Sequence, residues 1–152
     1  MTTTSETQIP AIEPGTARVW FLRPSSSPNG NVEAAAPTIL ANDAPIADIP
    51  AGTDFFRDFP PGTYGFTVRW LYSSARCDGR CVQPYGLTTG QADTVQLAAG
   101  TQTYLQVGWI ANWEEGDFEA ARTFAPNSFG VLTISPELAH ANLPTMTYLG
   151  QR

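Results

Sequence analysis

Short segments of alternating apolar and polar residues, separated by turn-forming residues, constrain this chain more than any other feature of its sequence. In TYGFTVRWLY (63–72) every second residue is large and apolar, which places these side chains on one face of an extended strand. Pro60-Pro61-Gly62 directly precedes this segment and supplies a turn. Turn signals recur about every 8–12 residues, and amphipathic helices between the segments are lacking. This spacing predicts an all-β sandwich or barrel and argues against a parallel α/β fold.

We expect seven or eight short strands and one short C-terminal helix. The expected strands cover residues 17–23, 37–41, 46–49, 53–59, 63–72, 93–97, 103–110 and 129–134. NDAP (42–45) is expected to be a tight turn, and loops are expected at 73–92 and 111–128. Ser135 and Pro136 predict the start of a helix at 135–143, and the tail after it could add an edge strand.

Length and charge narrow the class of protein. The 152 residues fit one domain, and fourteen acidic against eight basic residues give a net charge of −6. Every basic residue is Arg and these are scattered, so nucleic-acid binding is not expected. The absence of Lys removes Schiff-base chemistry and the lysine of phosphate-binding loops. No apolar run approaches the ~20 residues of a membrane-spanning helix, so direct membrane insertion is not expected either.

Residues 1–16 are polar, contain two prolines and show no periodicity, so we expect a flexible N-terminal arm before a sandwich domain at 17–152. The arm lacks the basic start and apolar stretch of a signal peptide. The chain is therefore either cytoplasmic or a mature form whose leader has been removed. We expect the second, with a periplasmic or secreted location.

Two cysteines, Cys77 and Cys81, lie in SSARCDGRCVQPYG. Their spacing is one residue longer than the thioredoxin motif, and two thiolates alone cannot complete a structural zinc site. We expect a local disulfide, for which the chain-entropy model gives about 2 kcal/mol. Free thiols, or a redox or metal role, remain the alternatives. A disulfide would place the protein in an oxidising compartment.

No catalytic, cofactor-binding or metal site is expected. The single histidine, His140, lies in no nucleophile motif, so a partly exposed or capping role is favoured over a Ser-His-Asp or Cys-His site. A dense acidic cluster lacks the pattern of a calcium loop or a glycosidase pair and is expected to be a solvated loop. It comprises Glu114, Glu115, Asp117 and Glu119, and whether loop 114–119 binds a cation stays open.

Large apolar residues occupy both faces of two expected strands, although only one face of a sandwich strand meets the core. We therefore expect some of them to form an exposed, partner-binding patch. The candidates are Trp20, Leu22, Phe55, Phe56 and Phe59. The alternative is that loops or the C-terminal segment cover the outer face. A third possibility is a sugar-binding platform built from Trp20, Trp70, Trp109 or Trp113.

Four segments resemble a family of small bacterial envelope domains of unknown function. They are ARVWFLR, PTILANDAPIADI, GTDFFRDFPPGTYGFTV and VQLAAGTQTYLQV, and the likeness covers roughly residues 17–149. Pro61-Gly62-Thr63-Tyr64 and the hairpin from Ala99 to Tyr104 stand at the family's turn motifs. The chain departs from lipoprotein members because no lipobox Cys lies near its start. The resemblance implies an antiparallel, immunoglobulin- or transthyretin-like β-sandwich.

ARVWFLR, FFRDFPPGTYGFTV and LPTMTYLG are also similar to the small third subunit of membrane-bound quinohaemoprotein alcohol dehydrogenases. This likeness implies a periplasmic, cofactor-free accessory protein that stabilises a large PQQ-dependent catalytic subunit beside a cytochrome subunit. No catalytic residue can be carried over from that family. We therefore expect a non-enzymatic accessory subunit, with a carbohydrate- or cell-envelope-binding module as the alternative.

Overall fold

The computed structural model describes residues 3, 9–25, 36–73, 85–89, 93–109 and 129–152. Within these residues there are ten strands, one short α-helix and one 3-10 turn. The strands are β1 (Ala17–Arg23), β2 (Thr38–Ala41), β3 (Ala44–Asp48), β4 (Thr53–Phe59), β5 (Gly62–Ser73), β6 (Tyr85–Thr89), β7 (Asp93–Leu97), β8 (Gln102–Trp109), β9 (Phe129–Ile134) and β10 (Thr147–Gln151). The helices are α2 (Pro136–Asn142) and η4 (Leu143–Thr145).

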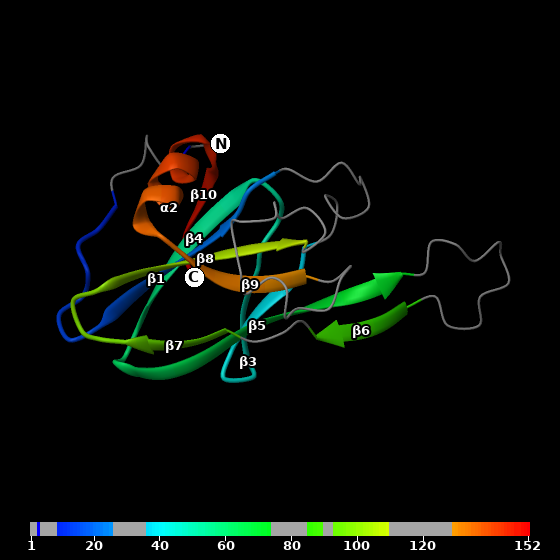
Figure 1. Ribbon diagram of the computed structural model, residues 1–152, viewed down its shortest axis with the longest axis horizontal. Coiled ribbons are helices and arrows are strands. Elements are labelled where there is room, and N and C mark those ends of the chain that lie inside the picture. The colour runs from blue at the N-terminus through cyan, green and yellow to red at the C-terminus, as the bar shows by residue number, and fades with distance from the viewer. Residues whose placement is uncertain (1–2, 4–8, 26–35, 74–84, 90–92, 110–128) are drawn as a thin grey trace, which may run out of the picture.

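Two five-stranded sheets lie one on the other, and α2 lies on the outer side of the sheet that contains β1, β4 and β8 (Figure 1). Sheet A has the order β10-β4-β1-β8-β9, and sheet B has the order β3-β2-β5-β6, with β7 also paired to β5. The prediction of an all-β sandwich with a C-terminal helix is confirmed.

We expected antiparallel sheets from the sequence, but sheet A also contains parallel pairs. β1 pairs in parallel with β8, and β10 pairs in parallel with β4. Parallel neighbours need a crossover connection. Between β4 and β8 the chain passes through sheet B, and between β9 and β10 it passes through α2 and η4. The first detour lets β8 pair with β1 instead of with β4, and the second returns β10 in the same direction as β9, which a hairpin could not do.

The alternating strands bury their expected faces between the two sheets. Phe66, Val68 and Trp70 of β5 point into this space, as the sequence predicts. We call the buried set the inner core. Its members are Ala17, Val19, Phe21, Ile39, Ile49, Phe55, Phe59, Phe66, Val68, Trp70, Leu97, Leu105, Val107, Phe129 and Val131.

β5 is long enough to pair with two strands besides β2, which accounts for one strand that the sequence did not predict. Its first half, Gly62–Phe66, pairs with β7, and its second half, Arg69–Ser73, pairs with β6. β6 lies within the expected loop 73–92. Its five residues carry little periodicity of their own, so the strand is defined by the neighbouring edge of β5.

The hairpin between β2 and β3 turns at two residues with positive φ, Asn42 (46°) and Asp43 (66°). A two-residue turn of this kind matches the twist of the flanking strands. The Asn42 side-chain oxygen accepts a hydrogen bond from the Gly65 backbone N–H at 2.8 Å, which ties the turn to β5. β3 begins at Ala44, so the turn is shorter than the expected 42–45.

Replacing Asp43 by glycine is expected to raise the free energy of unfolding by about 0.5–1 kcal/mol. Glycine adopts the left-handed conformation without the steric cost that a Cβ brings. Asp43→Ala, at the same position, should instead lower it. Urea unfolding of the three proteins measures both changes, and equal midpoints for the glycine and alanine variants would contradict this account of the turn.

The C-terminal segment begins as the sequence predicts. The Ser135 hydroxyl accepts a hydrogen bond from the Leu138 backbone N–H at 3.2 Å, and Pro136 occupies the first turn of α2. The tail forms β10 at one edge of sheet A, where Thr147 also makes an isolated antiparallel bridge with Thr3. None of the helices in the described ranges is long and apolar enough to cross a membrane.

Candidate functional site

The outer face of sheet A, which faces away from sheet B, carries a second buried cluster beneath the C-terminal segment. We call it the outer cluster. Its buried members come from four strands and from the helical segment that follows β9. They are Trp20, Leu22, Phe56, Tyr104, Ile134, Ala139, Leu143 and Met146, with Ile9 and Tyr148 packed against them. Sheet A is therefore covered on both faces.

The prediction of an exposed, partner-binding patch on these strands is wrong. All five candidate residues are buried: Trp20 is 4% exposed, Phe59 is 6% exposed, and Leu22, Phe55 and Phe56 are 0% exposed. Phe55 and Phe59 belong to the inner core, whereas Trp20, Leu22 and Phe56 belong to the outer cluster. The alternative, that the C-terminal segment covers the outer face, is confirmed.

Two of the four tryptophans proposed for a sugar-binding platform are buried. Trp20 and Trp70 are 4% and 6% exposed, and they lie in the outer cluster and the inner core respectively. Neither ring offers a free face to a sugar. Trp113 and the side chain of Trp109 lie outside the described residues.

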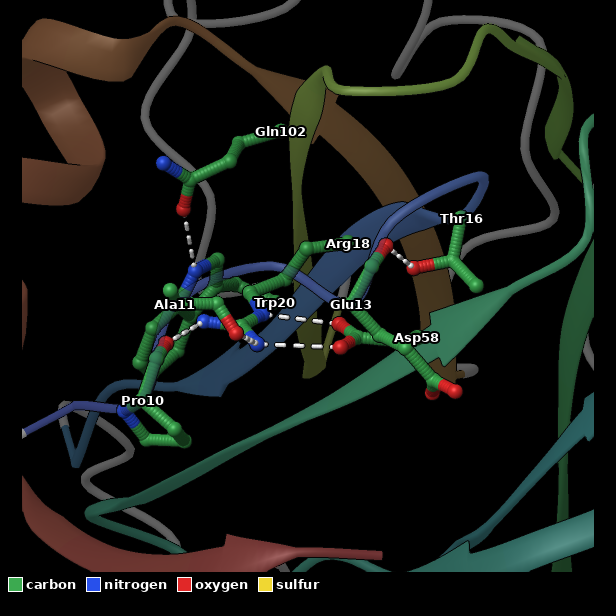
Figure 2. Close-up of polar contacts among 8 residues, drawn as sticks. All are labelled: Pro10, Ala11, Glu13, Thr16, Arg18, Trp20, Asp58 and Gln102. Carbon is green, nitrogen blue, oxygen red and sulfur yellow. Dashed lines mark hydrogen bonds and ion pairs between the residues drawn. The ribbon is translucent and has the colours of Figure 1, made fainter.

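A buried ion pair lies at the start of β1 (Figure 2). Arg18 Nε donates to Asp58 Oδ1 at 2.7 Å and Arg18 Nη2 donates to Asp58 Oδ2 at 2.9 Å. The same guanidinium donates to the backbone carbonyls of Pro10 and Ala11. Its Cζ lies 3.9 Å from the centroid of the Phe56 ring. The two charged side chains are only 3% and 4% exposed, so nearly all of their hydrogen-bonding capacity is met within the protein.

Strand register creates this pair. Arg18 lies opposite Asp58 in the β1–β4 ladder and opposite Gln102 in the β1–β8 ladder. Gln102 accepts a hydrogen bond from the Trp20 indole N–H at 2.9 Å. A polar strip therefore crosses three strands of sheet A at the border of the outer cluster, where it satisfies a buried indole as well as a buried guanidinium.

The surroundings of Asp58 favour its charged form. The hydrogen bond from Arg18 lowers the pKa of the Asp58 carboxyl below 3.8, and the positive charge of Arg18 and a backbone hydrogen bond from Glu13 act in the same direction. Burial opposes them by raising the pKa, and the net shift is downward. The fold is thus stabilised when Asp58 is ionised.

Acidification should therefore destabilise the protein through Asp58. A carboxyl whose pKa is lower in the folded than in the unfolded state adds stability that is present above the unfolded-state pKa. That stability is lost as the pH falls below 3.8 towards the folded-state pKa. We expect Asp58→Asn to reduce the slope of stability against pH between about pH 5 and about pH 2. Urea unfolding measures the slope, with the exposed carboxylate variant Asp43→Asn as control; equal slopes for the two variants would refute the role of Asp58.

His140 joins α2 to sheet A. Its Nε2 lies 3.1 Å from the Tyr104 hydroxyl, and the two rings meet edge to face with centroids 5.4 Å apart. Burial raises the pKa of Tyr104, which keeps its hydroxyl protonated and able to donate. His140 itself is exposed, so its contact with Tyr104 is positioned to hold the helix against β8.

Asp93 joins the two sheets where β7 of sheet B lies near β9, an edge strand of sheet A. One carboxylate oxygen accepts from the backbone N–H of Thr133 at 2.8 Å and from its hydroxyl at 2.9 Å. Thr133 lies on β9, an edge strand of sheet A, and Asp93 begins β7 of sheet B. The Asp93 carboxylate thus pairs with the Thr133 N–H, a donor that an edge strand would otherwise present to another chain.

Other candidates from the sequence fall outside the described residues. These are the cysteine pair, Cys77 and Cys81, and the acidic loop 114–119. Among the residues that are described, no three His, Cys, Asp or Glu side chains gather in a way that could hold a metal ion.

The pairing of Arg18 with Asp58 is not predicted by the sequence. The two residues lie 40 positions apart, and only the β1–β4 register brings them together. The available signal was an ionisable residue on the outer face of each strand, in line with Trp20 and Phe56. Comparison with protein-family models gives no match, and comparison with curated protein sequences gives none.

Proposed function

We propose that this protein is a non-catalytic accessory subunit that binds and stabilises a larger periplasmic protein, the catalytic subunit of a PQQ-dependent quinohaemoprotein alcohol dehydrogenase. Two lines of argument support the proposal. One is the similarity of ARVWFLR, FFRDFPPGTYGFTV and LPTMTYLG to the small third subunit of such enzymes. The other is how the described fold uses its ionisable side chains.

The observation that carries the proposal is that these side chains connect structural elements. Arg18 and Asp58 join β1, β4 and the segment before β1, while Asp93 joins β7 to β9. His140 connects α2 to β8 through Tyr104. Catalytic acids, bases and nucleophiles need access to a substrate and partners that orient them towards it. The connections made here instead strengthen a rigid scaffold, which suits a protein whose role is to support another.

The proposal does not place the partner on the aromatic strands, because their rings fill the protein's own interior. A covered, well-packed sandwich can still bind a partner through its exposed residues, since specific interfaces are on average no more apolar than the remaining protein surface. The partner is therefore expected to bind residues on the exposed surface of the sandwich.

A periplasmic location belongs to the same proposal. It is supported by the expected disulfide between Cys77 and Cys81, since such bonds persist in oxidising compartments. Intact mass of the protein from its native source, before and after reduction, tests the bond. We expect a gain of two hydrogen atoms on reduction, and an unchanged mass would remove this support.

Purification from the organism that makes the protein tests the function. We expect a quinone-dependent dehydrogenase subunit to copurify in stoichiometric amount with a tagged full-length chain isolated under mild conditions from membranes and periplasm. The dehydrogenase should also lose activity faster on warming when the chain is absent. Recovery of the chain as a solitary monomer, or a dehydrogenase whose thermal inactivation does not depend on it, would refute the proposal.

A further inference from the structure

The segment before β1 is held on sheet A through the Arg18–Asp58 pair. We call residues 9–13 the N-terminal strap. The carbonyls of Pro10 and Ala11 accept hydrogen bonds from the Arg18 guanidinium (Figure 2). The Glu13 backbone hydrogen-bonds the Asp58 carboxylate. Three backbone groups of the strap therefore depend on one ion pair. Residues 9–16 belong to the arm that was expected to be flexible, yet they make these defined contacts.

The strap contributes little buried surface of its own. None of its five residues is buried, and Ile9 is the side chain that packs, half-buried, against the outer cluster. Segments with few buried apolar contacts open with a smaller free energy than the core of the same protein. Its described hydrogen bonds to sheet A run through two side chains and not through a strand ladder, so they can be lost together without breaking either sheet.

A turn at the end of the strap provides a hinge. The Thr16 backbone N–H and hydroxyl both donate to the Glu13 carbonyl, at 3.1 and 2.6 Å, and Gly15 has a φ of +80°. Beyond the turn the chain is fixed, because the Gly100 N–H donates to the Thr16 carbonyl at 2.8 Å. Motion of the strap can therefore end at residues 13–16 and leave β1 in place.

We propose that the N-terminal strap is a detachable cover, clasped by Arg18 and Asp58, that opens while both sheets remain folded. Opening removes the Pro10 and Ala11 carbonyls from the guanidinium and uncovers its free donors. Arg18 still lies over the Phe56 ring and beside Asp58. The opened surface is thus a cation above an aromatic ring, suited to the backbone carbonyls of another extended peptide segment.

Native-state amide hydrogen exchange on the full chain tests the proposal. Exchange of the Glu13 amide reports opening of the contact between the strap and the Arg18–Asp58 pair, which we call the clasp. Exchange of the Phe21 and Leu105 amides, in the middle of β1 and β8, reports opening of the core. We expect the protection of Glu13 to be at least about 100-fold lower than that of the core amides. We also expect it to be insensitive to low urea, as is typical of local opening.

A double variant, Arg18→Met/Asp58→Leu, removes the clasp without leaving a buried charge unpaired. The remaining protection of Glu13 should fall to near that of an unstructured amide, whereas the core amides should change by less than about tenfold. Arg152→Met makes the same arginine change at an exposed position and should leave Glu13 unaffected.

Two results would overturn the proposal. In the native protein, exchange of Glu13 at the core rate and with the same urea dependence would make the strap part of the global folding unit. In the double variant, unchanged protection of Glu13 would show that the clasp does not hold the strap. Should the double variant fail to fold, the comparison within the native protein decides the matter alone.

Discussion

Replacing Phe56 by alanine is expected to lower the free energy of unfolding by about 3–5 kcal/mol, the range typical of a large-to-small change in a well-packed core. Phe56 is 0% exposed, with its ring centroid 5.0 Å from that of Trp20 and 6.2 Å from that of Tyr148. The loss has two parts. Apolar surface returns to water, and a cavity remains that the neighbouring rings on β1 and β10 can fill only in part.

Phe21→Ala and Leu138→Ala provide matched comparisons for this prediction. Phe21 belongs to the inner core, and its truncation should cost a similar amount. Leu138 is 39% exposed on α2, and its truncation should change stability by no more than about 0.5 kcal/mol. Urea unfolding of the isolated, monomeric protein measures all three. If Phe56→Ala behaved like Leu138→Ala, the outer face of sheet A would not be a packed interior.

Replacing Arg18 by methionine is the second change with a large expected effect, about 3–5 kcal/mol. The substitution leaves the Asp58 carboxylate 4% exposed without its cation, and it removes the donors of the Pro10 and Ala11 carbonyls. Removing one partner of a buried ion pair costs more than the pair itself contributes, because the remaining charge stays desolvated. We expect the lower end of the range, since release of the strap lets water reach Asp58.

Adding Asp58→Leu to Arg18→Met should restore most of the lost stability. Replacing both charges by apolar side chains of similar size is often neutral for a buried pair. The single and double variants, together with Asp58→Leu alone, form a cycle that measures the coupling by urea unfolding. Additive losses across the cycle would show that the two side chains do not interact as the structure describes.

Much of the fold follows from local sequence signals. Short apolar segments bounded by turn residues predicted the bounds of β4, β7 and β9, and the serine-proline start of α2 predicted its cap. These features depend on residues close in the chain, where turn chemistry and side-chain periodicity determine the structure. The missed strand, β6, depends instead on the length of β5, which local periodicity does not report.

The candidate site was harder to predict because it depends on contacts between distant residues. The sequence shows that β1 carries large apolar residues on both faces, and all seven of its residues are buried. It does not show which segment covers the outer face. Two explanations fitted the pattern equally, a partner or the chain's own C-terminal segment, and only the placement of α2 and η4 over sheet A separates them. Strand register, likewise, decided that Arg18 meets Asp58.

Nuclear Overhauser contacts in the isolated protein at low concentration test most directly whether the chain covers its own aromatic face. The His140 ring of α2 should show contacts with the Tyr104 ring of β8, whose centroid lies 5.4 Å away. The Tyr148 ring of β10 should show contacts with the rings of both Trp20 and Phe56, whose centroids each lie 6.2 Å away. Contacts at these positions in a monomer are what a self-covered sheet predicts. Their absence, with the Trp20 and Phe56 rings open to solvent, would mean that this face is left for another molecule.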